Sequence, residues 1–176
     1  MFKVLCADPP WAFDDKLPGK TRGAERHYSC MTTRELCRFS LPPLDDDCVL
    51  FLWRVASMPQ AALDVVEMWG FTPKTEIVWL KKTAHGNRWF GMGRTVRAEH
   101  ETCIIATRGR PKVLNHSVRS TFVTDFAGLS AQVGRHSSKP EEFYKIVETL
   151  FVGPYCELFA RRQRPGWTCQ GDEANS

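Results

Sequence analysis

The sequence predicts a single α/β domain, residues 1–176, with a mostly parallel sheet and helices on both faces. Three observations support this fold class. An apolar run, a helical pattern and a second apolar run follow one another with short joints, at 48–53, 57–69 and 77–80. This strand, helix, strand rhythm is typical of parallel sheets. The 176 residues are 43% hydrophobic, enough for one sizeable core, and the chain shows neither internal repeats nor low-complexity segments.

The first predicted strand, Phe2–Cys6, leads into a loop that carries chemistry. Asp8 comes directly after the strand, at the end where open α/β sheets bind their ligands. Pro9 and Pro10 then exclude both a helix and further sheet pairing, so a stiff loop is expected. This loop presents a carboxylate, the Pro9 carbonyl and the ring of Trp11.

Such a loop suits a planar base with an exocyclic amine. Asp8 and the Pro9 carbonyl can each accept one amine hydrogen while Trp11 stacks on the ring. An adenine amine is a poor nucleophile because its lone pair is delocalised, and two acceptors that hold its hydrogens out of plane direct the lone pair at an electrophile. Asp8 would stabilise the charge that develops on nitrogen. The alternative interpretation is a Pro-Pro turn after an edge strand.

The segment Phe13–His27 is polar and shows no helical or strand period. A loop of this length is expected to close over a substrate, and a disordered insertion is the alternative. Thr32 and Glu35 then form a capping-box pattern, which predicts a helix through about Phe39.

The central strand and helix are bounded by polar residues and glycine. Asp45–Asp47 are expected to form a solvated turn before the strand, and Ser57 and Gly70 to bound the helix. Three tryptophans of this region are interpreted as core aromatics: Trp53, Trp69 and Trp79. The first of them also ends a strand on the ligand side, which makes it a candidate substrate contact.

The segment Lys81–His100 interleaves basic side chains with two aromatics, Trp89 and Phe90. Basic side chains bind phosphates and aromatic rings stack on unpaired bases, so this segment is a candidate nucleic-acid surface. Its candidate phosphate contacts are Arg88, Arg94 and Arg97. A solvated surface loop is the alternative. A strand over 101–105 is expected to follow.

Two C-terminal elements favour a small anionic ligand and a nucleoside. Pro140 suits the first turn of a helix with apolar positions 143, 146, 147 and 150, and Lys139 precedes it. An ammonium beside exposed helix amides favours a carboxylate. A last strand over Cys156–Arg161 ends in a polar loop, at the edge where a nucleoside would be held.

Composition limits the partners, metals and cellular compartment that are expected for this protein. The net charge of +4 permits an anionic partner without requiring one. The seven cysteines show no C-x-x-C pair and no zinc-ligand spacing, so no metal is expected and the compartment should be reducing. The N-terminus lacks signal-peptide features and no apolar run reaches membrane-spanning length, which predicts a cytoplasmic protein without membrane contact.

Three motifs, D-P-P-W at 8–11, H-S-x-K-P at 136–140 and E-L-F-x-R at 157–161, occur in matching order in a known family. The chain resembles the DPPW-type N(6)-adenine methyltransferases, the family that includes the catalytic subunit of the eukaryotic messenger RNA adenine methyltransferase. It looks like a small bacterial or phage-like member. The resemblance runs from Leu5 to about Glu173 and implies a Rossmann-like S-adenosylmethionine-dependent methyltransferase fold in the permuted motif order.

The resemblance also implies site residues. The implied catalytic residues are Asp8, Pro9, Pro10 and Trp11. The substrate contacts would be Tyr28, at the rim of the adenine pocket, and Trp53, together with the arginines Arg88, Arg94 and Arg97. The implied contacts to S-adenosylmethionine are Asp8, Lys139, Glu157, Phe159, Arg161, Gln163 and Asp172. Lys139 would bind the methionine carboxylate and Asp8 the ammonium.

The expected activity is methyl transfer from S-adenosylmethionine to the exocyclic amine of adenine in a polynucleotide, with the base flipped or single-stranded. DNA is favoured over RNA because the chain is short. RNA methylation and an inactive nucleic-acid-binding subunit remain alternatives, and a homodimer or a partner subunit stays open. Gln163-Arg164 and Asp172-Glu173 depart from the family pattern. Larger members also have a segment ahead of the catalytic strand that helps to hold the cofactor, and whether its absence weakens binding stays open.

Overall fold

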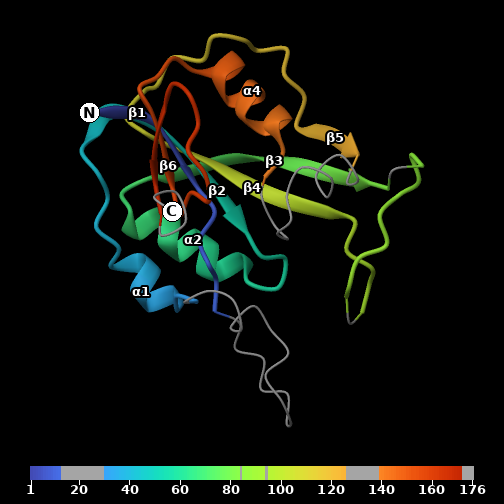
Figure 1. Cartoon of the computed structure of the whole chain (residues 1–176). Coiled ribbons are helices and arrows are strands. Elements are labelled where there is room, and N and C mark those ends of the chain that lie inside the picture. The colour runs from blue at the N-terminus through green and yellow to red at the C-terminus, as the bar shows by residue number, and fades with distance from the viewer. Residues whose placement is uncertain (13–29, 84, 94, 126–138, 172–176) are drawn as a thin grey trace.

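One mixed sheet organises the computed structural model, which describes residues 1–12, 30–83, 85–93, 95–125 and 139–171. In these residues seven strands pair in the order β5-β3-β4-β2-β1-β6-β7 (Figure 1). The strands are β1 (Phe2–Ala7), β2 (Leu44–Arg54), β3 (Thr72–Lys82), β4 (His100–Arg108), β5 (Thr121–Asp125), β6 (Tyr155–Leu158) and β7 (Trp167–Gln170). The helices are α1 (Thr33–Cys37), α2 (Pro59–Met68) and α4 (Glu141–Leu150).

The pairing is mostly parallel, as the sequence predicts. β1 pairs in parallel with both β2 and β6, β3 with β5, and β6 with β7. β4 lies antiparallel between β2 and β3. The arrangement is a Rossmann-like α/β fold. The strand pattern alone predicted neither the direction of β4 nor the short strands β5 and β7.

Helices cover both faces of the sheet (Figure 1). Side chains alternate along β1, so Leu5 and Ala7 face α1 and α2 while Val4 and Cys6 face α4. On the α4 face, Phe51 meets Phe143 edge to face with ring centroids 5.9 Å apart. Among the described helices, none is long and apolar enough to cross a membrane.

Local signals predicted most helix ends. The capping box of α1 is present, with the Thr32 hydroxyl accepting the Glu35 N–H, and Gly70 stops α2 with a φ of +80°. Two predictions are corrected, because the N-cap of α2 is Met58 rather than Ser57, and Pro140 is the N-cap of α4 rather than part of its first turn.

The acidic run Asp45–Asp47 lies inside β2 and not in a turn, which corrects a third prediction. The pairing with β1 shifts register in this region, since Phe2 pairs with Leu44 and Val4 with Val49. The irregularity leaves the carboxylates of the run on the surface, and Asp47 Oδ1 accepts the Arg110 N–H at 2.6 Å. β6 also ends earlier than predicted, at Leu158, because Phe159 adopts a left-handed φ of +59°.

Candidate active site

The D-P-P-W loop leaves β1 at the carboxyl edge of the sheet. Ala7 pairs with Leu52 on one side and Leu158 on the other, so Asp8 emerges between the ends of β2 and β6. The loop is then tied to the segment ahead of α1, since the Met31 N–H donates to the Pro10 carbonyl at 2.7 Å and the Ala12 N–H donates back to Met31 at 2.9 Å. These bonds fix the loop on a rigid strand end.

The two predicted acceptors for an amine both lie in this loop. The Asp8 side chain is 22% exposed. The Pro9 carbonyl accepts the Trp11 N–H at 2.9 Å, and a carbonyl oxygen carries two lone pairs, so one acceptor position remains. The loop therefore retains the pair of acceptors that the sequence predicts.

Trp11 differs from its predicted role as an open stacking face. Its side chain is only 6% exposed and packs in the core between the sheet and α1/α2. The indole N–H donates to the Trp53 carbonyl at 3.1 Å, which ties the loop to the end of β2. In this conformation Trp11 positions the loop, and its ring offers almost no surface to a base.

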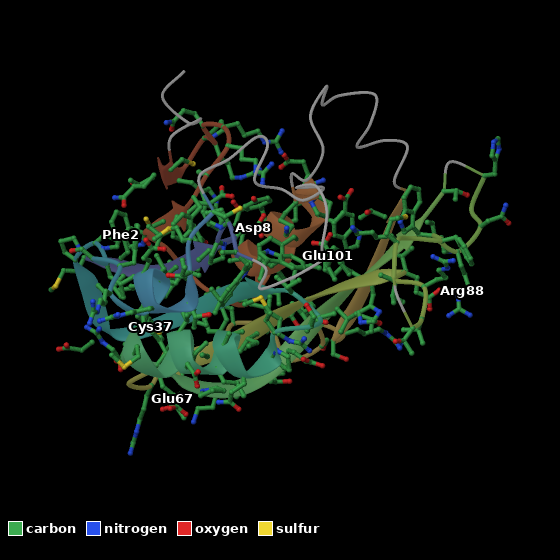
Figure 2. All side chains as sticks on the ribbon, turned by 90° about the horizontal axis from the view of Figure 1, so that it is seen from below. Phe2, Asp8, Cys37, Glu67, Arg88 and Glu101 are labelled. Atoms are coloured by element: carbon green, nitrogen blue, oxygen red, sulfur yellow. The ribbon has the colours of Figure 1, made fainter. Side chains whose placement is uncertain are left out.

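Lys139 joins Asp8 to a second acid, Glu101. Its Nζ lies 2.7 Å from Asp8 Oδ2 and 3.1 Å from Glu101 Oε2, and 5.0 Å from the centre of the Trp53 ring. Only 7% of the Lys139 side chain is exposed. Figure 2 shows Asp8 and Glu101 close to one another at this edge. Three elements distant in sequence thus meet in one ion-pair cluster.

The charges in this cluster balance. Burial by itself raises the pKa of Glu101, but Lys139 and Lys81 outweigh it and lower that pKa to about 2. Burial lowers the pKa of Lys139, whereas Asp8 and Glu101 raise it above its ordinary value. Lys81 also pairs with Glu101, so two ammonium groups face two carboxylates. Such buried charges are tolerated because each has a partner.

Glu101 is a site residue that the sequence did not predict. The sequence pattern placed it only at the first position of a strand over 101–105. Because β4 runs antiparallel to its neighbours, its amino end lies at the carboxyl edge of β1 and β2, and this brings Glu101 to Lys139. The direction of β4 was the missing signal.

β6 brings the predicted cofactor residues to the same edge. Glu157 lies beside Cys6 of β1 and accepts the Tyr144 hydroxyl at 2.5 Å. Burial raises the pKa of Glu157. Phe159 follows in its left-handed conformation and packs against Phe39, with ring centroids 4.9 Å apart. Arg161 follows within the connection to β7, as does Gln163.

A second ion-pair group flanks this strand. Arg162 and Arg164 both pair with Glu141, in the first turn of α4, and the Arg164 guanidinium lies 3.4 Å from the centre of the Tyr144 ring. The loop after β6 is thereby attached to the helix that follows Lys139. Within the described residues, no group of histidine, cysteine, aspartate and glutamate could hold a metal ion.

Comparison with known proteins agrees with this geometry. The family model described as MT-A70 matches residues 2–173. The chain belongs to the MT-A70 family. The resemblance inferred from the three motifs is therefore confirmed. The D-P-P-W loop follows the first strand of the sheet.

Relatives of this MT-A70 chain carry two kinds of name. It is 29% identical over 183 residues to the human N(6)-adenosine-methyltransferase catalytic subunit METTL3, covering 98% of the chain and 28% of the relative. A probable N(6)-adenosine-methyltransferase MT-A70-like protein of Oryza sativa is 30% identical, with 99% and 23% covered. The type II methyltransferase M.MunI of a Mycoplasma species is 26% identical, with 98% and 77% covered. The chain thus spans about a quarter of the length of the first two.

The predicted substrate residues of the MT-A70 chain lie in two places. Trp53 is 3% exposed, so the prediction that it is a core aromatic, like Trp69 and Trp79, is confirmed. Its indole N–H has no hydrogen-bond partner among the described residues. Arg88 lies far from Asp8, beyond the ends of β3 and β4 (Figure 2), and pairs with Glu99. Arg97 lies in the same segment, and its guanidinium covers the Phe90 ring. The predicted loop 13–27 and the residues Tyr28, Arg94 and Asp172 lie outside the described residues.

Proposed function

We propose that this chain transfers the methyl group of S-adenosylmethionine to the exocyclic amine of adenine in a polynucleotide. The observation that carries the proposal is the pair of acceptors at the end of β1, the Asp8 carboxylate and the Pro9 carbonyl, with Asp8 held by the buried ammonium of Lys139. Relatives named N(6)-adenosine methyltransferases support the same reaction.

The residues at this edge fit the cofactor. S-adenosylmethionine supplies an electrophilic methyl group on a sulfonium, and its amino acid end and its nucleoside need separate partners. Asp8 would accept the ammonium and Lys139 would bind the carboxylate. Glu157 is a buried acceptor at the end of β6, which suits a ribose hydroxyl, and Phe159 with Arg161 and Gln163 would flank the nucleoside. The donors and acceptors therefore match both ends of the molecule.

The chain's own contribution to catalysis is position and electrostatics. Asp8 and the Pro9 carbonyl would accept hydrogen bonds from the two amine hydrogens and hold them out of the ring plane, so the nitrogen lone pair is no longer delocalised and points at the methyl donor. Positive charge then develops on nitrogen, and the fixed Asp8 carboxylate stabilises it. Lys139 keeps that carboxylate in one orientation, because it is itself held by Glu101. No covalent enzyme intermediate is needed.

DNA is the proposed substrate. The relative named a type II methyltransferase, of which the chain covers 77%, supports this choice. RNA is the second candidate, favoured by the N(6)-adenosine methyltransferase names of several relatives. In either case the adenine must be unpaired or flipped out of the stack to be reached.

Labelled methyl transfer tests the proposal. The purified chain is incubated with methyl-labelled S-adenosylmethionine and with single-stranded DNA, duplex DNA or RNA, and the products are digested to nucleosides. Label in N6-methyladenine from DNA is expected. Label only from RNA would establish the second candidate. Polynucleotide binding without transfer on any substrate would overturn the proposal and identify an inactive binding subunit.

A further inference from the structure

The connection between β3 and β4, residues 83–99, forms a finger that projects from the end of the sheet (Figure 1). Its described tip exposes large apolar side chains to an unusual degree. Phe90 is 74% exposed, Met92 91% and Val96 76%. Large apolar side chains exposed together on a small element indicate an interaction site.

The tip is held in shape by its backbone. The Trp89 N–H donates to the Lys81 carbonyl at 3.1 Å and the Gly91 N–H donates to the Ala98 carbonyl at 2.9 Å. A Cβ at Gly91 would lie 2.3 Å from the Ala98 carbonyl oxygen, and one at Gly93 would lie 1.9 Å from that of Val96. Both positions therefore require glycine, and the exposed side chains stand on a defined turn.

The two described arginines of the finger have different partners. Arg88 is bonded through two nitrogens to both carboxylate oxygens of Glu99, which closes the stem of the finger. Glu99 is the only acid in the sequence between Lys81 and His100. Arg97 makes no ion pair with a described residue, and its guanidinium carbon lies 4.9 Å from the centre of the Phe90 ring. An arginine on one face of an exposed ring leaves a cationic edge and a second, open ring face.

We propose that Phe90 and Arg97 form a stacking platform for an unpaired base on the same strand as the target adenine. This inference rests on the proposed function. Unpaired bases stack on aromatic rings, and arginine adds both a stacking plane and charge for the adjacent phosphate. Arg88 is then a residue of the stem and not a phosphate contact.

The finger's charge and position favour nucleic acid over a second protein. Arg97 has no acidic partner among the described residues, and a polyanion supplies phosphates that can pair with it. The stem also begins at the active-site cluster, because Lys81 and Glu101, which pair with each other, stand at its two ends. A strand with its adenine at Asp8 would continue along the finger.

Binding to two single strands of equal charge tests the platform. One probe is a fluorescent 20-mer of thymidine nucleotides, and the other is the same length of abasic nucleotides. The chain without cofactor is expected to prefer the strand with bases. Phe90→Leu keeps an apolar side chain but removes the aromatic face, so it should reduce that preference roughly fivefold or more, the lower end for one stacked base. Phe90→Tyr should retain it.

Two controls make the result specific. Met68→Ala removes an equally exposed apolar side chain from α2 and should change neither affinity. Arg97→Ala should lower affinity for both strands and reduce the salt dependence by roughly one unit, whereas Phe90→Leu should leave the salt dependence unchanged. An unaltered base preference in Phe90→Leu would overturn the proposal, as would sedimentation showing a dimer that Phe90→Leu and Met92→Ala convert to monomer.

This test and the test of methyl transfer can fail separately. The binding measurement uses no S-adenosylmethionine, so a chain that transfers no methyl group can still show the base preference and its loss in Phe90→Leu. Conversely, a chain that methylates adenine while Phe90→Leu binds and reacts like the wild type would retain the proposed function and lose the platform.

Discussion

Asp8 is the residue on which the proposed chemistry depends, and its neighbours are arranged so that its removal should leave the fold intact. Without Asp8, Lys139 still has Glu101 at 3.1 Å as its counter-ion. The buried ammonium would therefore keep a partner. This separates the catalytic role of Asp8 from any role in stability.

Asp8→Ala should reduce methyl transfer about a hundredfold or more, the usual cost of losing one electrostatic contact to a transition state. The assay is labelled transfer onto the best substrate, with circular dichroism to verify folding. Asp64→Ala, which removes a carboxylate bonded to Gln60 on α2, is the matched control and should keep full activity. Residual activity within tenfold of wild type would contradict the proposed role.

Lys139, in contrast to Asp8, should be important for stability, because it is buried between two acids. Lys139→Met should lower the free energy of unfolding by about 3 to 5 kcal/mol, since two buried carboxylates lose their partner. Adding Glu101→Gln to that variant should recover part of the loss. Denaturant unfolding of the two single variants and the double variant measures the coupling. Strict additivity of the two changes would exclude the direct interaction.

Glu101 should also make stability depend on pH in the acid range. Its folded-state pKa of about 2 lies below the ordinary 4.5, so its stabilising contribution is complete above pH 4.5 and is lost as the pH falls toward 2. Glu101→Gln should therefore lose less stability than the wild type over this window. Urea midpoints measured between pH 5 and pH 2.5 give the comparison, and parallel curves would contradict it.

At the scale of elements, the antiparallel strand β4 connects two edges of the sheet. Its amino end supplies Glu101 to the site, and its other end runs into Gly109, which has a φ of +63°. There a Cβ would lie 2.3 Å from Asp47 Oδ1 and 2.4 Å from the Asp46 carbonyl oxygen. The acidic run of β2 therefore sets the tight turn after β4.

Gly109→Ala should destabilise the chain by more than Gly70→Ala does. Both positions are left-handed, which costs an alanine roughly 1 to 2 kcal/mol, but a Cβ at Gly70 meets nothing within 4 Å. The difference between the two unfolding free energies isolates the contact with Asp46 and Asp47. Equal unfolding free energies of the two variants would show that the turn at Gly109 accommodates a Cβ without additional cost.

At the scale of the whole molecule, cofactor binding should stabilise the fold, because the proposed contacts come from β1, α4 and β6 together. S-adenosylmethionine at a hundred times its dissociation constant should add about 2.7 kcal/mol to the unfolding free energy. Thermal melting with and without cofactor measures it. Asp8→Ala should reduce the shift, whereas Lys112→Ala, in the exposed segment after β4, should not.

Prediction from sequence succeeded where the signal was local. The capping box at Thr32, the helix stop at Gly70 and the strand before Asp8 each depend on a few neighbouring residues. The fold class followed from their order. Partners distant in sequence were not predictable in this way, as the Lys139 contacts to Asp8 and Glu101 show.

The same limit applies to individual side chains. Trp11 was expected to be open, and its burial depends on the carbonyl of Trp53, a residue 42 positions away. Arg88 was predicted only as a candidate phosphate contact, and its pair with Glu99, 11 positions away, was not foreseen. The residue type determines which interactions a side chain can make, whereas the pairing of the strands determines which partner it meets.

Because β1 lies in the centre of the sheet, the sheet cannot be completed until strands much later in the sequence have been synthesised. β1 is made first, yet its partner on one side, β6, emerges only after residue 154. Until then one edge of β1 has unpaired backbone groups, and Asp8 and Glu101 lack the ammonium of Lys139. A nascent chain that lacks β6 would thus expose an unpaired strand edge beside unneutralised acids, and this exposure favours aggregation until Lys139 and β6 are in place.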